Sequence, residues 1–340
     1  MTILPSFSQY AGKPVLVTGA TGFTGRVLTR KLVEAGAMVS AIARMSSDLK
    51  DLAELDIKWY RGDVFDPDVV AEAASEALYI FHLAAAFREV KSDDAEYRLV
   101  HLDSTKLLAR AAIKIPGFKR FVHISTVGVH GHIENGRADE NFRFAPGDGY
   151  QRTKLEGELW LAEYATAQNL PYSIIRPGPI FGPGDLRLLK IYRMVNKGYM
   201  LILGKGKCMY HLVHVDDLTN IIILAGITDA ALSEVMIAVG DEPIPIEEKA
   251  RMIARKINKP VRMIHLPLWP FYLASDLCEL VCKPLGLQPL IYRRRVDFYT
   301  KDRAFDNTKV KRLLNYEFKY NNETGVEESI RWYQEKGLLD

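Results

Sequence analysis

The chain has 340 residues, of which 48% are hydrophobic and 26% are charged, so it can form one large domain or two unequal ones. Its net charge of +3 is too small, and its basic residues too evenly spread, to indicate nucleic-acid binding. The three cysteines lack metal-binding or redox spacing, residues 1–13 lack a secretory-signal pattern, and the apolar runs are too short to span a membrane. These features predict a cytoplasmic globular protein.

A glycine-rich turn near the amino terminus joins a predicted strand to a predicted helix. Residues 15–17 are an apolar run typical of a buried parallel strand, and apolar residues at helical spacing follow Arg26. Gly19 allows a tight turn, Gly22 lets the backbone approach a pyrophosphate, and Gly25 lets the helix lie near the strand. Free N–H groups and the helix dipole would face the phosphates. The placement favours a dinucleotide site over a merely tight turn, with Thr21, Phe23 and Thr24 as further cofactor-binding residues.

The end of the second strand, predicted over residues 37–44, bears on the choice of cofactor. An NAD site usually has Asp or Glu there, which hydrogen-bonds the ribose 2′-hydroxyl. This chain has Arg44, followed by Ser46 and Ser47, and a guanidinium beside hydroxyls suits a 2′-phosphate. The alternative is a solvated surface arginine. The sequence therefore favours NADP, with NAD as the second possibility.

The next two strands would bring further residues to the same sheet edge. The third, residues 57–61, leads to Asp63 and Val64, where the adenine would lie, although an aspartate after a strand is also a common helix cap. The fourth, residues 78–83, ends in three alanines, whose small side chains leave room for a flat ligand. Its expected cofactor-binding residues are Leu83, Ala84 and Ala85.

A tyrosine and a lysine begin the helix that follows the loop at 141–149. Tyr150 and Lys154 are four residues apart and share a helix face, and the preceding strand, residues 121–124, delivers Ser125 and Thr126 to the same edge. Alone, such a pair is more often a solvated face. A free phenol has a pKa near ~10, and an ammonium and a bound pyridinium nearby would lower it. Tyr150 would then exchange a proton with the substrate oxygen held by Thr126, while Lys154 bonds the nicotinamide ribose.

These residues together resemble the extended branch of the short-chain dehydrogenase/reductases, within the NAD-dependent epimerase/dehydratase family. The matching segments run in the expected order over about two thirds of the chain: Thr18-Gly19-x-x-Gly22-x-x-Gly25, Gly62-Asp63-Val64, His82-x-Ala84-Ala85, Ile124-Ser125-Thr126, Tyr150-x-x-x-Lys154, Arg176-Pro177-Gly178 and His214-Val215-Asp216-Asp217.

The resemblance implies an α/β fold: a Rossmann doubly wound parallel sheet with a smaller, mostly helical C-terminal substrate domain. The expected division is 1–177 for the dinucleotide-binding domain, with 211–240 returning to it, and 178–210 plus 241–340 for the substrate domain. It also implies a Thr126/Tyr150/Lys154 catalytic set, cofactor contacts at Pro177 and Gly178, and a homodimer formed through the helices near 95–112 and 150–168.

Three departures from the family pattern narrow the expected reaction. Dehydratases of this branch carry an acidic pair after the catalytic threonine, where this chain has Val127 and Gly128. Many nucleotide-sugar epimerases have an arginine that grips the diphosphate where this chain has Tyr210. His101 stands where the family often has asparagine.

The segment 264–295 is dense in large apolar and aromatic residues and ends in three arginines. Three alternatives fit it: a helix packed on the substrate domain, a lid over a lipid-like or sterol-like substrate, and a membrane-surface contact, the least favoured. The residues from Asp302 to Asp306 and Trp332-Tyr333 resemble the 3β-hydroxysteroid-dehydrogenase-like subgroup, which points to an apolar small-molecule substrate.

The predicted function is an NAD(P)-dependent oxidoreductase that interconverts a secondary alcohol and a ketone, with a bulky apolar substrate. The alternative is a nucleotide-sugar 4-epimerase with tightly bound NAD. The missing diphosphate arginine and the missing acid after Ala43 count against the epimerase, and the intact Thr126, Tyr150 and Lys154 count against a non-catalytic cofactor-binding protein.

Overall fold

A computed structural model describes residues 5–86, 94–134, 136–282, 296, 300 and 302–339. The main sheet contains β1 (Pro14–Thr18), β2 (Met38–Ala43), β3 (Ile57–Arg61), β4 (Tyr79–His82), β5 (Arg120–Ile124), β6 (Tyr172–Pro177) and β11 (Glu234–Ala238). The remaining strands are β7 (Ile180–Phe181), β8 (Tyr199–Leu203), β9 (Met209–Tyr210), β10 (Val213–His214), β12 (Ile244–Pro245) and β13 (Arg262–Leu266).

The helices are α1 (Phe23–Glu34), α2 (Pro67–Ala74), α3 (Asp94–Arg98), α4 (Ser104–Ala112), α5 (Gly149–Gln168), α6 (Leu189–Asn196), α7 (Val215–Ile227), α8 (Ile246–Lys256), α9 (Trp269–Cys282), α11 (Thr308–Leu314) and α12 (Asn322–Glu335). Short 3₁₀ turns cover Pro5–Tyr10, Lys50–Leu52, Val127–His130 and Asp229–Ala231, and a π-helical turn, η3, covers Leu99–Asp103. The helix expected through residues 97–110 therefore contains a π-helical turn.

The main sheet is parallel throughout, in the order β11-β6-β5-β4-β1-β2-β3. The chain winds outward in one direction from β1 to β3 and in the other from β4 to β11. In such sheets, ligands bind beyond the carboxyl ends of the strands where the winding direction reverses, which here is between β1 and β4. The predicted doubly wound Rossmann sheet is confirmed.

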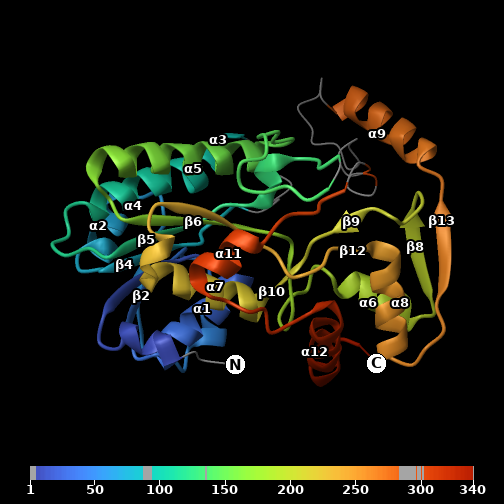
Figure 1. Ribbon diagram of the computed structural model, residues 1–340, viewed down its shortest axis with the longest axis horizontal. Coiled ribbons are helices and arrows are strands. Elements are labelled where there is room, and N and C mark those ends of the chain that lie inside the picture. Colours follow the sequence, from blue (N-terminus) through green and yellow to red (C-terminus); the bar gives the residue numbers. More distant parts are fainter. Residues whose placement is uncertain are drawn as a thin grey trace.

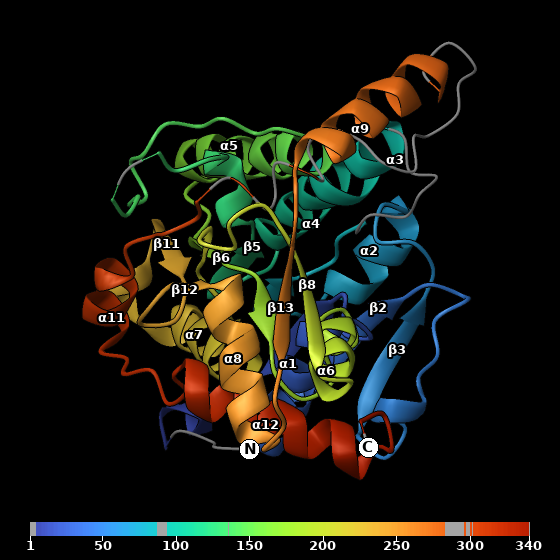
Figure 2. The ribbon, with the colours of Figure 1, turned by 90° about the vertical axis from the view of Figure 1, so that its right-hand side faces the viewer.

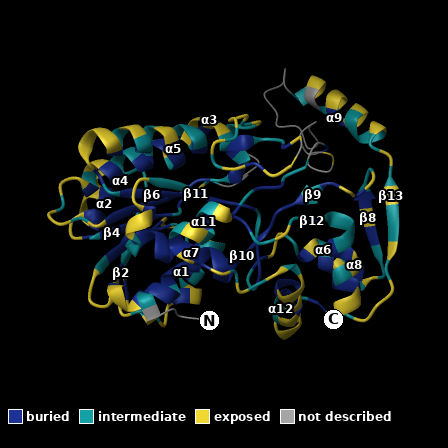
Figure 3. Cartoon of the chain, in the orientation of Figure 1, coloured by how far each residue is buried: buried dark blue, intermediate teal, exposed yellow. Residues whose placement is uncertain are grey.

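Helices cover both faces of the sheet (Figure 1). Helices α1, α7 and α11 pack on one face through a core that includes Leu28, Ile221 and Val310. Helices α2, α4 and α5 pack on the other through Val70, Leu108 and Leu161. The strands between the two layers are the most deeply buried part of the molecule (Figure 3).

A third apolar cluster lies beside the sheet and joins α6, β8, α8 and α12 (Figure 2). It contains Tyr192, Ile253 and Tyr333, and β8 pairs with β13 in parallel register. The range 241–340, predicted to belong to the substrate domain, also includes α11, which packs on the core of the main sheet. The carboxyl-terminal part of the chain thus contributes both to this cluster and to the core of the main sheet.

Helix α9 exposes much of its apolar surface and projects from the body of the molecule (Figures 1 and 3). Trp269 is 69% exposed, Leu273 and Leu277 are each 54% exposed, and Leu280 is 70% exposed. Of the three alternatives for 264–295, a helix packed through its apolar face is therefore wrong for the described part of α9. Residues 283–295, which include the three arginines, lie outside the described residues. Within the described part of the chain, no helix is long and apolar enough to cross a membrane.

Candidate active site

The glycine turn between β1 and α1 has the shape of a cofactor cradle. Gly19 has φ +73°, and a Cβ there would lie 2.8 Å from the main-chain nitrogen of Ala84. A Cβ on Gly25 would overlap the carbonyl oxygen of Gly19, so α1 can lie this close to the turn only with glycine at position 25. Gly22 caps α1 without a side-chain hydrogen bond. The first N–H groups of α1, including those of Phe23 and Thr24, lack intrahelical acceptors, as at any helix start, which suits a pyrophosphate.

A loop distant in sequence covers this turn, which the sequence did not predict. Gly184 approaches the ring of Phe23, because a Cβ at position 184 would lie 3.3 Å from it. The guanidinium of Arg187 lies 5.6 Å from the centre of the same ring. Arg187 is held in place because its Nη2 donates to the Ile180 carbonyl at 2.7 Å and its Nε to Asp185 at 2.8 Å. The chain turns sharply here through Gly182, Pro183 and Gly184, with φ of +130° at Gly182 and +95° at Gly184.

The residues expected around the adenine lie at the ends of β2 and β3. Arg44 is exposed directly after β2, with Ser46 exposed and Ser47 half-buried beside it. Arg61, at the end of β3, donates to the Met45 carbonyl at 2.6 Å and so supports the turn that carries Arg44, a role that was not predicted from the sequence.

Asp63 is exposed, and the cap of α2 is Asp66, whose carboxylate accepts from the main-chain N–H of Asp68 at 2.9 Å. The helix-cap alternative for Asp63 is therefore wrong. Val64 is half-buried against the core under α2.

The loop after β4 forms the floor beside the glycine turn. Leu83 donates its main-chain N–H to the Thr18 carbonyl at 3.1 Å, and Ala84 donates to the Thr18 hydroxyl at 3.2 Å. Leu83 is half-buried, Ala84 is buried and Ala85 is exposed. The main chain of Leu83 and Ala84 therefore lies directly against Gly19.

Lys154 lies buried between the ends of β4 and β5. Its Nζ donates to the Ile124 carbonyl at 2.9 Å and, more weakly, to the Ala84 carbonyl at 3.5 Å. Burial lowers the pKa of this amine to about 7, so only part of it is charged at neutral pH. The carbonyl that holds this amine thus belongs to Ile124, which precedes Thr126 by two residues in the chain.

Thr126 and Tyr150 lie in two turns that pack against each other, the one after β5 and the first turn of α5. The Thr126 hydroxyl oxygen accepts from the Gly128 main-chain N–H at 3.1 Å, and Gly128 packs against Gln151, the residue after Tyr150. Tyr150 is half-buried in the first turn of α5, where its ring meets the imidazole of His101 edge-on at 5.2 Å. Ser125, the other hydroxyl at this edge, is buried.

Pro177 and Gly178 lie at the end of β6, and packing explains the glycine there. A Cβ on Gly178 would overlap the carbonyl oxygen of His211, and its main-chain N–H donates to the Ala238 carbonyl at 3.0 Å. Pro177 is buried at the last position of the strand. The local contacts thus require a glycine at position 178 whether or not a cofactor is bound.

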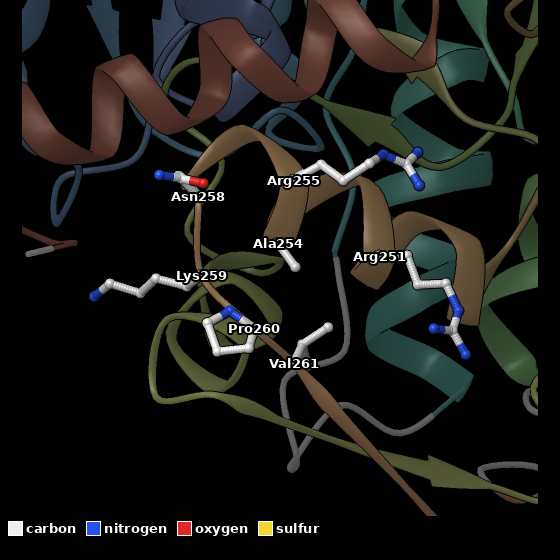
Figure 4. Close-up of a pocket in the computed structure, with 7 residues that line it drawn as sticks. All are labelled: Arg251, Ala254, Arg255, Asn258, Lys259, Pro260 and Val261. Carbon is white, nitrogen blue, oxygen red and sulfur yellow. The ribbon is translucent and has the colours of Figure 1, made fainter.

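A cavity of about 480 Å³ lies elsewhere, at the carboxyl end of α8 (Figure 4). Its cations are largely engaged: Arg251 and Arg255 pair with Glu247 and Glu248, and Lys259 donates to Asn196. All of its lining residues come from α8 and the segment after it and none from the main sheet, so the candidate active site is the sheet edge near β1, β4 and β5 rather than this cavity.

Residues 15–238 match the model of the NAD dependent epimerase/dehydratase family. The chain is 27% identical to UDP-glucose 4-epimerase of Vibrio cholerae, over 78% of this chain and 82% of that one. It is 26% identical to the decarboxylating sterol-4-alpha-carboxylate 3-dehydrogenase of Saccharomyces cerevisiae, over 94% and 98%. It is also 26% identical to 3beta-hydroxysteroid-dehydrogenase/decarboxylase isoform 2 of Arabidopsis thaliana, over 88% of this chain but 58% of that longer one.

Solved structures share the fold. The crystal structure of gox2253 superposes with a TM-score of 0.81 at 25% identity, covering 97% of this chain and all of that one. The UDP-glucuronic acid 4-epimerase of Bacillus cereus in complex with NAD gives a TM-score of 0.76 at 21% identity, covering 95% and 99%. At that identity, the second likeness shows the fold alone.

Proposed function

Because the chain belongs to the NAD-dependent epimerase/dehydratase family, we propose that it is an oxidoreductase that interconverts a secondary alcohol and a ketone. The observation that carries the proposal is the position of Lys154. Its amine bonds to the last carbonyl of β5, two residues before Thr126, and it lies one helical turn after Tyr150. The Ala84 carbonyl, whose residue adjoins Gly19, also accepts from this amine and so holds it near the glycine turn.

A nicotinamide cofactor, when bound, would supply the hydride chemistry of the proposed reaction. Thr126 holds the substrate oxygen through its hydroxyl, and Tyr150 passes a proton to or from that oxygen. The charged form of Lys154 would favour the phenolate of Tyr150, and the amine would also hold the nicotinamide ribose of a bound cofactor. Because burial lowers the pKa of Lys154 to about 7, this electrostatic help weakens as the pH rises above neutrality.

A bulky apolar substrate is favoured by α9 and by two of the relatives. Trp269, Leu273 and Leu277 recur at i, i+4 and i+8 and are all more than half exposed. The Saccharomyces and Arabidopsis relatives are named for sterol or steroid substrates. We propose that α9 belongs to the substrate-binding part of the chain, with residues 178–210 and most of 241–340, and covers an apolar substrate as a lid.

For the cofactor, we propose NADP in preference to NAD, with Arg44 on the 2′-phosphate. The exposed position of Arg44 directly after β2 is compatible with that role, and Arg61 supports its turn. Asp63 and Val64 would then lie by the adenine. We further propose a homodimer through α3, η3, α4 and α5.

A nucleotide-sugar epimerase is the second candidate, and one observation favours it. Arg303 adjoins Tyr210, the position where many epimerases carry the diphosphate arginine, because its main-chain N–H donates to the Met209 carbonyl at 3.0 Å. The cation missing from position 210 could therefore come from a distant part of the chain. The Vibrio relative is named as such an epimerase.

The two functions are separated by assaying the purified protein with two probes. The first is NADP⁺ or NAD⁺ reduction with a 3β-hydroxysteroid, followed at 340 nm; the second is interconversion of UDP-glucose and UDP-galactose. An oxidoreductase exchanges its cofactor freely and reduces it with the steroid, whereas an epimerase retains NAD through purification and needs Arg303. Tyr150→Phe should remove either activity by at least ~100-fold and leave cofactor affinity within about twofold. Full activity of this variant would overturn the proposal.

A further inference from the structure

The imidazole of His101 packs directly against the ring of the proposed catalytic tyrosine. His101 is fully buried in the π-helical turn η3, and its ring meets that of Tyr150 at 5.2 Å with the planes at 89°. Tyr97 stacks on the same imidazole at 5.6 Å and also meets Tyr150 edge-on at 6.2 Å. The phenol ring of Tyr150 therefore has two aromatic neighbours on η3 and α3 that limit its rotation.

Hydrogen bonds fix the tautomer of this imidazole. The main-chain N–H of Ala86 donates to Nε2 of His101 at 3.1 Å, so Nε2 is the acceptor and Nδ1 carries the proton. Nδ1 then donates to the Thr153 hydroxyl at 2.8 Å, and that hydroxyl donates to the Gly149 carbonyl at 2.8 Å. The imidazole thus joins the loop after β4 to the first turn of α5, which carries Tyr150.

The same network continues to the glycine turn through a second imidazole. The Thr105 hydroxyl donates to the His101 carbonyl at 2.7 Å and accepts from Nε2 of His82 at 3.0 Å. Nδ1 of His82 accepts from the Thr18 hydroxyl at 2.7 Å. A series of hydrogen bonds, which passes through the main-chain carbonyl of His101, therefore runs from Thr18, the residue before Gly19, to the turn of Tyr150.

Neither imidazole is suited to exchange protons with a substrate. Both nitrogens of each ring have partners inside the protein, and both rings are fully buried. Burial lowers the pKa of His82 to about 3 and that of His101 to about 2, so both stay neutral across the working pH range. What remains for His101 is a geometric role.

We propose that His101 is a positioning residue for Tyr150: it holds the phenol ring and the first turn of α5 in register with the loop after β4. The inference deepens the proposed function and rests on it. Catalytic groups must lie within about 0.5 Å of the productive geometry, and a side chain locked at both nitrogens can impose that accuracy. His101 therefore takes the place of the family's asparagine with a ring that also contacts the tyrosine.

Two substitutions of His101 separate the contributions of the two hydrogen bonds that its imidazole makes. His101→Asn keeps a donor near the position of Nδ1, toward Thr153, but loses the acceptor for Ala86. His101→Gln keeps an acceptor near the position of Nε2, toward Ala86, but loses the donor for Thr153. Thr153→Val removes the shared hydroxyl with little change of volume and serves as the mildest variant should either histidine variant fail to fold.

The first readout needs no turnover. Exchange of the Ala86 amide hydrogen, followed by mass spectrometry of the cofactor-free protein, should be faster in His101→Asn than in the wild type and nearly unchanged in His101→Gln. The second is kinetic, with the steroid assay. Both variants should lower kcat by about 10-fold or more and leave the KM for NADP⁺ within about twofold. The losses in kcat from His101→Gln and Thr153→Val should not add up in the double variant, because both substitutions remove the same hydrogen bond between His101 and Thr153.

The inference fails if both histidine variants keep a kcat within twofold of the wild type, or if KM for the cofactor rises in proportion to the loss in kcat. Tyr150→Phe is assayed beside them. If Tyr150→Phe is inactive while the histidine variants are fully active, only the role of His101 is overturned. If Tyr150→Phe is fully active, the proposed function itself falls.

Discussion

The Nζ of Lys154 donates to the main-chain carbonyl of Ile124 at 2.9 Å and so ties α5 to the end of β5. The Ala84 carbonyl, at 3.5 Å, accepts a second, weaker hydrogen bond from the same Nζ. A charged amine has three protons, so one remains for a ligand, whereas a neutral amine has none to spare. Because the two carbonyls take one proton of the amine each, Lys154 can donate to a bound ligand only when it is protonated.

Replacing Lys154 by methionine should stabilise the fold and abolish activity. In the unfolded chain the amine holds its proton up to pH ~10.4, but in the folded chain only up to about pH 7. The unfolded state thus binds more protons between these values, so the cost of burying the amine is full below pH 7 and disappears above ~10.4. Lys154→Met should raise Tm by about 2 °C or more at pH 6 and by less at pH 9, and lower kcat by at least ~100-fold.

Lys249→Met is the matched comparison. Lys249 is also buried, lies 4.5 Å from the centre of the Phe181 ring, and has a pKa lowered to about 7 by burial. Its removal should give a similar pH-dependent gain in Tm with kcat within about twofold of the wild type. Scanning calorimetry at the two pH values tests both variants. A gain of equal size at pH 6 and pH 9 would contradict the assigned protonation.

Arg44→Ala should weaken the binding of NADPH by about 10-fold or more and leave that of NADH within about twofold. Removing the guanidinium costs a charge-assisted hydrogen bond only to NADPH, because NADH carries no 2′-phosphate. Dissociation constants from tryptophan fluorescence quenching provide the measurement. Lys50→Ala, at an exposed cation further along the same surface segment, is the control and should change neither affinity. At least tenfold tighter binding of NADH than NADPH by the wild type would disprove the preference.

The local parts of the site could be predicted because their signals are local. A strand, three glycines and a helix within about a dozen residues determine the turn at Gly19, and a spacing of four places Tyr150 and Lys154 on one helix face. The order of the parallel strands then follows from the fold that the motifs imply.

The features of the site that could not be predicted from the sequence depend on contacts between distant segments. Arg187 lies over Phe23 only because the loop after β7 returns to the glycine turn. The periodicity of α9 indicates which of its faces is apolar but not whether another segment covers that face. The role of His101 likewise depends on Ala86 and Thr153, which lie on separate elements.

Two exposed leucines on η3 and α5 test the proposed dimer. Leu99 is 40% exposed and Leu159 is 49% exposed, on neighbouring elements of one face. If this face forms the interface, Leu99→Glu with Leu159→Glu would bury two carboxylates and should yield a monomer in light scattering behind gel filtration. Leu232→Glu alters a residue that is 47% exposed and lies outside these helices, and should leave the mass at twice that of one chain. A wild type that elutes as a monomer at micromolar concentration would refute the dimer.

The buried ion pair between Arg176 and Glu158 should matter for stability rather than for cofactor binding, although Arg176 belongs to the family motif. The guanidinium is 3% exposed and the carboxylate 2%, and the Nε of Arg176 donates to Glu158 at 3.0 Å. Nη1 of the same arginine also donates to the Glu140 carbonyl at 2.9 Å, so it ties α5 and β6 to the loop that precedes the site.

Removing one partner leaves the other charge buried without compensation, so Glu158→Gln or Arg176→Met should each lower the free energy of unfolding by about 3–5 kcal/mol. The double variant Arg176→Met with Glu158→Leu should cost clearly less than the sum of the two single changes, because no unpaired charge remains. Urea unfolding followed by circular dichroism provides these values, and NADPH affinity should stay within about twofold wherever the protein is folded. Additive losses, or a selective loss of cofactor affinity, would instead assign Arg176 to the binding site.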